Sequence, residues 1–275
     1  KRFNTTGSCN PAQHYMVDTS RKLAQIEEYI EEGLYFTINR ARQFGKTTTM
    51  DSLFRLLSDK YFMIKISFEG LGEEDYREGR LFLSEFQKIL VKKIKTVSPD
   101  LADFWKTPAL SFGDLSQKVY DFCKLVNKPV VLMIDEVDKS QNNQLFLDLL
   151  GMLRNLYLER SESGDMHSTF HSVILAGVYD VKNLKLKLRP DEERKYNSPW
   201  NIAAKFKVDM TFHPDEIITM LNEYEADHHT GMNRDFIAKE IYKYTNGYPY
   251  LVSEICSLIE SEFDRDWSER GIQMA

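Results

Sequence analysis

Four short apolar runs separated by amphipathic patterns constrain the fold of this chain more than any other feature. The runs cover residues 34–38, 61–68, 129–134 and 172–178, and polar turns bound them. A continuous apolar run of this length indicates a strand that is buried on both faces. The stretches between the runs carry apolar residues three and four apart, which is typical of helices. Strands that alternate with helices predict an α/β fold, a parallel sheet sandwiched by helices.

The C-terminal part of the chain has a different pattern. Phe206, Val208, Met210 and Phe212 alternate with polar residues, which predicts a last strand. After it the apolar spacing is helical throughout, over residues 216–226, 234–244 and 249–263. We therefore predict two domains: an α/β domain of residues 1–212 and a small helical domain of residues 213–275.

The turn after the first apolar run has the pattern of a phosphate-binding loop. Gly45-Lys46-Thr47-Thr48 stands directly where the next helix begins. Backbone N–H groups of such a turn and the helix dipole attract phosphate. We expect Lys46 to reach the β- and γ-phosphates, Thr47 to supply its hydroxyl to Mg²⁺, and Thr48 to lie near the α-phosphate. The predicted nucleotide-binding residues are Arg42, Gln43, Phe44, Gly45, Lys46, Thr47 and Thr48.

The loop departs from the pattern G-x-x-x-x-G-K-[ST] at one position, because Arg40 stands where the first glycine belongs. The alternative is a strand-turn-helix that merely contains Gly-Lys-Thr. Glycine is scarce in the whole chain, 13 in 275 residues or about 5% against an average near 7%. A phosphate loop in this chain must therefore use few glycines.

A second signal supports nucleotide binding. The apolar run Val130–Ile134 ends in the adjacent carboxylates Asp135 and Glu136. At the carboxyl edge of a parallel sheet, Asp135 would face the same crevice as the phosphate loop. We predict that Asp135 and Thr47 are the Mg²⁺ ligands and that Glu136 orients or deprotonates the attacking water, so the catalytic residues are Glu136, Lys46 and Asp135.

With these residues in place, the stretch Tyr35–Thr48 resembles the loop of bacterial AAA-like ATPases. This "predicted AAA-ATPase" group lies in the STAND and archaeal-ATPase branch of P-loop proteins. Its members carry an R-x-R-x-[FY]-G-K-[ST] loop without the leading glycine, so the resemblance makes Arg40 a family feature. Weaker matches at residues 14–18, 198–202 and 246–251 extend the resemblance over nearly the whole chain. It implies an ATP-binding core with strand order 5-1-4-3-2, followed by a helical lid that closes on the nucleotide.

Other residues that such an ATPase needs are harder to assign. The strand that ends near Val178 lacks a polar sensor residue at its tip, and Tyr179 and Asp180 are possible substitutes, with ordinary loop residues as the favoured interpretation. Solvated surface is likewise favoured for four arginines that could stabilise transition-state charge: Arg154, Arg160, Arg189 and Arg194.

Two further arginines belong to the predicted phosphate loop itself and are therefore expected to lie closer to the phosphates. Arg40 and Arg42 could pair with phosphate or with the carboxylates of Glu136 or Asp138.

Charge and composition exclude several classes of protein. The chain has 36 basic and 42 acidic residues, and the net charge of -6 disfavours a globally basic nucleic-acid binder. The basic residues of the connection 181–201 are interrupted by Asp191–Glu193, so a solvated loop is favoured over a DNA contact. No window is apolar over the roughly 18 residues that a membrane helix needs. Three widely spaced cysteines without a C-x-x-C pair, and the lack of a signal peptide, favour a cytoplasmic location.

We therefore expect an ATPase that hydrolyses Mg·ATP to drive a conformational switch. One alternative is a nucleotide-gated scaffold with little turnover, which the missing polar sensor favours. Another is an ATP-controlled DNA-binding module of a mobile-element or defence system, which the net charge disfavours. The expected partners are ATP or ADP, together with a protein partner or a second copy of the chain. We expect no association with a membrane.

Overall fold

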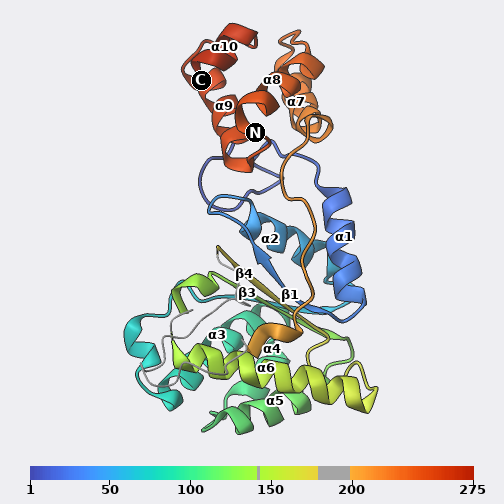
Figure 1. The fold of residues 1–275 in the computed structure, drawn as a ribbon, viewed down its shortest axis with the longest axis vertical. Coiled ribbons are helices and arrows are strands. Elements are labelled where there is room, and N and C mark those ends of the chain that lie inside the picture. The colour runs from blue at the N-terminus through green and yellow to red at the C-terminus, as the bar shows by residue number, and fades with distance from the viewer. Residues whose placement is uncertain (141–142, 179–198) are drawn as a thin grey trace. The chain divides into compact units, whose positions relative to one another are not determined.

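The computed structural model describes residues 1–140, 143–178 and 199–275, apart from the side chain of Lys139 (Figure 1). The chain divides into two compact units. The sheet unit consists of Glu27–Ala41 and Ser52–Lys207, as far as these residues are described. The helical unit consists of Lys1–Ile26, Arg42–Asp51 and Val208–Ala275. The phosphate loop and the N-terminal segment therefore group with the C-terminal helices.

The sheet unit contains one parallel sheet. Its strands are β1 (Tyr35–Asn39), β2 (Phe62–Ser67), β3 (Val130–Asp135) and β4 (Ser172–Gly177), in the order β1-β4-β3-β2. All three pairings are parallel. The four apolar runs thus form the strands predicted from them, and the order agrees with the last four positions of 5-1-4-3-2.

The prediction of a fifth strand over residues 206–212 is wrong. A single parallel bridge joins Ala204 to β1, and no strand follows it in this part of the chain. The Tyr29 hydroxyl donates to the carbonyl of Lys205 at 3.1 Å and accepts from the amide of Lys207 at 3.2 Å. A side chain therefore satisfies backbone groups that a strand would use for pairing, and the sheet has four strands among the described residues.

Helices pack beside the strands of this unit. They are α3 (Gly79–Val97), α4 (Pro99–Ala102), α5 (Phe112–Leu125) and α6 (Gln144–Ser163), with short 3-10 turns at Glu73–Tyr76, Asp103–Trp105, Val137–Ser140 and Pro199–Ile202 (Figure 1). The Ser111 side chain accepts from the amide of Asp114 at 3.0 Å, so Ser111 is the N-cap of α5. The buried core includes Trp105 and Trp200, and the indole N–H of Trp200 donates to the Thr37 hydroxyl at 2.9 Å.

Two helices contribute residues to both units. They are α1 (Ser20–Glu31) and α2 (Lys46–Leu57). α2 lies between two of the apolar runs, where the spacing predicts a helix, and both helices bury apolar side chains, for example Ile26 and Met50.

The helical unit is built from four helices and the N-terminal segment. The helices are α7 (Pro214–His228), α8 (Arg234–Thr245), α9 (Pro249–Ser261) and α10 (Glu269–Met274). Phe3 and Tyr15 pack their rings against Tyr224 of α7, with centroids 5.1 and 5.2 Å away. The Tyr15 hydroxyl also donates to Asp227 at 2.8 Å. Within the part of the chain that the structure describes, no helix is both long and apolar enough to cross a membrane.

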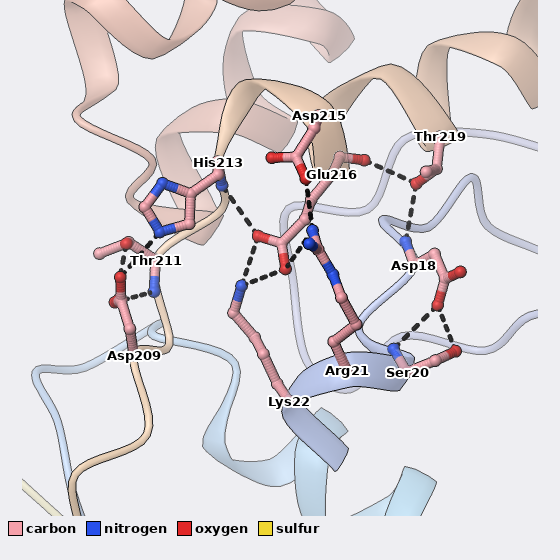
Figure 2. A network of polar contacts seen from close by, with 10 residues as sticks. All are labelled: Asp18, Ser20, Arg21, Lys22, Asp209, Thr211, His213, Asp215, Glu216 and Thr219. Carbon is pink, nitrogen blue, oxygen red and sulfur yellow. Dashed lines mark hydrogen bonds and ion pairs between the residues drawn. The ribbon is translucent and has the colours of Figure 1, made fainter. Parts of the chain in front are cut away.

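A polar network fixes the start of α7 to the start of α1 (Figure 2). Lys22 donates to both carboxylate oxygens of Glu216, and both side chains are buried. Glu216 also accepts the amide of His213, the residue before α7, at 2.9 Å. The neighbouring pair of Arg21 and Asp215 is exposed. One buried ion pair with a satisfied cap therefore joins residues that are 194 positions apart.

Candidate functional site

The phosphate loop places two residues in the left-handed backbone region just before α2. Gln43 has a φ of 56° and Gly45 a φ of 75°. A left-handed residue among right-handed ones turns successive N–H groups toward one side, which makes a concave anion site. A Cβ at Gly45 would meet nothing within 4 Å, so the need for glycine there comes from its φ and not from crowding by the protein.

The helix begins immediately after this turn. The amide of Thr49 donates to the carbonyl of Gly45 at 2.8 Å, the first bond of α2, and Lys46 is the first helical residue. The Lys46 side chain is largely buried, with 8% of the residue exposed. The turn is therefore followed directly by the helix, and Lys46 stands at their junction.

The N-terminal segment lies on the first turns of α2. The amide of Cys9 donates to the Thr48 hydroxyl oxygen at 3.1 Å, and the Ser8 hydroxyl donates to Asp51. The Thr48 oxygen thus accepts one bond within the protein, which leaves its proton for a second partner. The sequence contains no local signal for this contact, because the partners are about 40 residues apart.

The tyrosine at the start of α9 contacts the other end of the loop. The Tyr248 hydroxyl donates to the carbonyl of Arg42. The Tyr248 and Phe44 rings meet edge to face, with centroids 4.9 Å apart. Both contacts lie within the helical unit. The sequence alone indicates no role for Tyr248.

The acidic end of β3 belongs to the sheet unit. Asp135 is buried, with 3% exposed, and its Oδ1 accepts the amide of Glu136 at 2.9 Å. Glu136 has a φ of 56°, which turns the chain sharply away from the strand, and its side chain is partly exposed. A buried carboxylate followed by an accessible one suits a metal ligand followed by a general base.

Asp138 joins the tips of two neighbouring strands. Both of its carboxylate oxygens lie 2.7 Å from the amide nitrogen of Val178, which directly follows β4. A Cβ at Gly177 would lie 2.7 Å from the same carboxylate, so a larger residue there would have to displace the Asp138 side chain. Asp138 therefore orders the end of β4 and is engaged within the sheet unit.

Arg40, at the position of the missing glycine, is built into the sheet unit. Its amide donates to the carbonyl of Gly177 at 3.1 Å, and its guanidinium lies 5.4 Å from the ring centroid of Phe206. That ring in turn stacks on Phe36 of β1 at 5.8 Å. Arg40 is not among the residues with positive φ, so its backbone needs no glycine.

Among the remaining candidates, Arg160 does not lie on the solvated surface that the sequence predicts for it. It is neither solvated nor available as an arginine finger, because only 1% is exposed and its guanidinium donates to the carbonyls of Gly33, Phe170 and His171. Arg154 is partly exposed and donates to Asn201 at 3.2 Å.

Several sequence predictions lie outside the described residues. They concern the sensor candidates Tyr179 and Asp180, the arginines Arg189 and Arg194, and most of the basic connection.

The residues fit the chemistry of a nucleotide with its metal ion. Mg²⁺ takes oxygen ligands and few carboxylates, and the predicted ligands Thr47 and Asp135, one in each unit, carry oxygen donors of this kind. Among the described residues, no group of three or more His, Cys, Asp or Glu side chains could hold a metal ion by itself.

A known protein family covers nearly the whole chain. Residues 6–266 match the model of a family described as the AAA-like domain. The search of curated proteins found no match.

Solved structures share the fold. A Walker-type ATPase of Pyrococcus abyssi superposes with a TM-score of 0.63 at 14% identity, over 99% of this chain and 74% of that one. The Cdc6p protein of Pyrobaculum aerophilum gives 0.53 at 16% identity, over 97% and 66%. The ORC2 protein of Aeropyrum pernix, solved as ADPNP–ADP complexes, gives 0.52 at 14% identity, over 93% and 66%. This chain thus spans between about two thirds and three quarters of these proteins, and the likeness confirms the predicted α/β ATPase fold.

Proposed function

Because the chain belongs to the AAA-like domain family, we propose that it binds Mg·ATP at residues 42–48 and hydrolyses it to drive a conformational switch. The observation that carries this proposal is the loop itself. Gln43 and Gly45 adopt left-handed conformations directly before α2, and Lys46 opens that helix. This is the arrangement that cradles phosphate in P-loop proteins.

Each proposed site residue has a distinct task. Lys46 binds the β- and γ-phosphates, and the amides of residues 43–48 donate to the phosphate oxygens. Glu136 positions a water molecule and accepts its proton, for which its partly exposed side chain is suited. Thr47 and Asp135 would hold Mg²⁺, which when bound neutralises charge on the phosphates. These roles rest on the sequence pattern, the family and the local geometry of each residue.

The division of labour along the chain is also a proposal. Residues 1–212 would form the nucleotide-binding domain and residues 213–275 the lid that responds to it. The grouping of residues 42–51 with the C-terminal helices supports a response of these helices to the nucleotide. We propose a protein partner, or a second copy of the chain, as the receiver of the change.

The test is binding and turnover measured separately on the purified chain. We expect Lys46→Ala to weaken ATP binding by about 10- to 150-fold, because charge-assisted hydrogen bonds contribute roughly 1.5–3 kcal/mol. Glu136→Gln should bind ATP like the wild type while phosphate release falls by about 10²- to 10⁴-fold. Lys92→Ala, which changes an exposed lysine of α3, is the matched control and should alter neither quantity.

The outcomes separate the candidate functions. Binding without turnover in the wild type would show a nucleotide-gated scaffold in place of an ATPase. Absence of ATP binding in the wild type would refute the proposal as a whole.

A further inference from the structure

We propose that Tyr248 is a positioning residue for nucleotide binding: its hydroxyl fixes the peptide between Arg42 and Gln43 so that the Gln43 N–H serves as a phosphate donor. The inference rests on the proposed function and adds to it a specific residue of the helical unit. It starts from the two contacts that Tyr248 makes with the loop, one polar and one aromatic.

The hydrogen bond determines the orientation of a peptide plane. The Tyr248 hydroxyl donates to the carbonyl oxygen of Arg42. A trans peptide is planar, and its C=O and N–H point in opposite directions. The N–H of Gln43 belongs to the same peptide as this carbonyl, so it points away from the tyrosine. Fixing the carbonyl therefore fixes the direction of the amide donor.

The conformation of Gln43 gives this orientation a consequence. Its φ of 56° places it in the left-handed region, which a residue with a side chain adopts at a cost of roughly 1–2 kcal/mol. Without a restraint, the Arg42–Gln43 peptide would gain free energy by rotating to an ordinary conformation. The bond from Tyr248 opposes that rotation, and it also polarises the peptide and strengthens the N–H as a donor.

The aromatic contact holds the loop at a second point. The Phe44 ring lies edge to face with Tyr248 at 4.9 Å between centroids and an angle of 76°. Phe44 follows Gln43, so the two contacts restrain the residues on either side of the proposed donor. Edge-to-face pairs of this kind contribute about 0.5–1.5 kcal/mol beyond burial.

Tyr248 can act in this way because its own backbone is fixed. It occupies the N-cap position of α9, and its amide donates to the carbonyl of Thr245 at 3.0 Å. The preceding Gly247 has a φ of 73° and accepts the amide of Phe212 at 2.8 Å. A Cβ at Gly247 would lie 2.4 Å from the Phe212 carbonyl oxygen, so only glycine allows this approach. The turn between α8 and α9 is thus a rigid base for the tyrosine.

A reciprocal effect follows from this arrangement. If the turn stabilises the phosphate-binding form of the loop, bound phosphate must stabilise the turn by the same free energy. Nucleotide binding would then further stabilise the start of α9 through one side chain.

The experiment compares Tyr248→Phe with the wild type and with Tyr244→Phe, which removes the hydroxyl of an exposed tyrosine on α8. Tyr248→Phe keeps the ring against Phe44 and removes only the hydroxyl. We expect its affinity for ADP and ATP to fall about 2- to 12-fold, the equivalent of one neutral hydrogen bond. Affinity for AMP should stay within twofold, since the predicted donor serves the outer phosphates. Tyr244→Phe should match the wild type for all three nucleotides.

A spectroscopic readout separates positioning from a general loss of stability. In chain labelled with ¹⁵N-glutamine, ADP should shift the amide signal of Gln43, and the shift should shrink in Tyr248→Phe. The melting temperature of the variant without nucleotide should equal that of the wild type within about 2 °C.

The two proposals fail in different ways. If the wild type binds ADP and Tyr248→Phe binds it equally tightly, or loses AMP in the same proportion, the role of Tyr248 is refuted while nucleotide binding stands. An unchanged Gln43 shift in the variant also refutes it. If the wild type binds neither ADP nor ATP, both proposals fall together, and Lys46→Ala will show no difference from the wild type.

Discussion

Replacing Glu216 by alanine should destabilise the helical unit by about 4–6 kcal/mol. The Lys22 and Glu216 side chains are only 9% and 4% exposed, and Lys22 donates to both carboxylate oxygens (Figure 2). Removing one partner of a buried ion pair costs about 3–5 kcal/mol, because the remaining charge is left without compensation. Glu216 also accepts the amide of His213 at 2.9 Å, and this lost cap adds about 1 kcal/mol.

The assay is urea unfolding followed by far-UV circular dichroism at pH 7.5. With a denaturant slope of about 2 kcal/mol/M, typical of small units, the transition that includes the helical unit should move to lower urea by about 2–3 M. The slope itself should stay the same, since the mutation changes stability and not the exposed surface.

The chain provides a matched control in the neighbouring residue. Asp215 pairs with Arg21, and these side chains are 61% and 72% exposed. Exposed pairs contribute little to stability, so Asp215→Ala should leave the midpoint unchanged within error. The double variant Lys22→Met with Glu216→Leu should recover most of the loss, because it removes both charges together. Equal shifts for Asp215→Ala and Glu216→Ala, or no recovery in the double variant, would refute the argument from burial.

Two further predictions concern pH and backbone strain. Burial, and then the charge of Arg160, lower the pKa of His171 below its usual value, so the unfolded chain binds the proton more readily and stability should fall as the pH drops below about 6.5. Between pH 7.5 and 5.5 the urea midpoint should fall less in His171→Gln than in the wild type, because the contribution of His171 is removed. His167→Gln should show the same fall as the wild type. Gly247→Ala should lower the urea midpoint more than Gly164→Ala, although both glycines have a positive φ. A Cβ at Gly247 would lie 2.4 Å from a backbone oxygen, whereas a Cβ at Gly164 would meet nothing within 4 Å. Equal losses would show that φ alone sets the cost.

Local signals predicted the sheet unit well. Each apolar run became a strand because a residue buried on both faces must be apolar at every position, and this requirement is visible in the sequence. The N-cap at Ser111 is also a local feature, since its side chain satisfies an amide only three residues away.

The predictions failed where distant residues decide the structure. The alternation over residues 206–212 has the period of a strand, but the Tyr29 hydroxyl, far away in sequence, takes the backbone groups at residues 205 and 207. Arginine is usually exposed, yet the Arg160 guanidinium is buried in the core and donates to three backbone carbonyls. The contact of Tyr248 with Arg42 joins residues 206 positions apart. No pattern within a window of one helix or strand encodes such partners.

The scarcity of glycine acquires a physical meaning in the loop. The loop needs the left-handed region at only two positions, and Gly45 supplies one of them without strain. Gln43 supplies the other at a cost that glycine would avoid, and two contacts from Tyr248 restrain the residues on either side of it. Arg40 has no such requirement, and its side chain instead packs over Phe206. A chain can therefore build this loop with a single glycine when side chains elsewhere hold the strained residue in place.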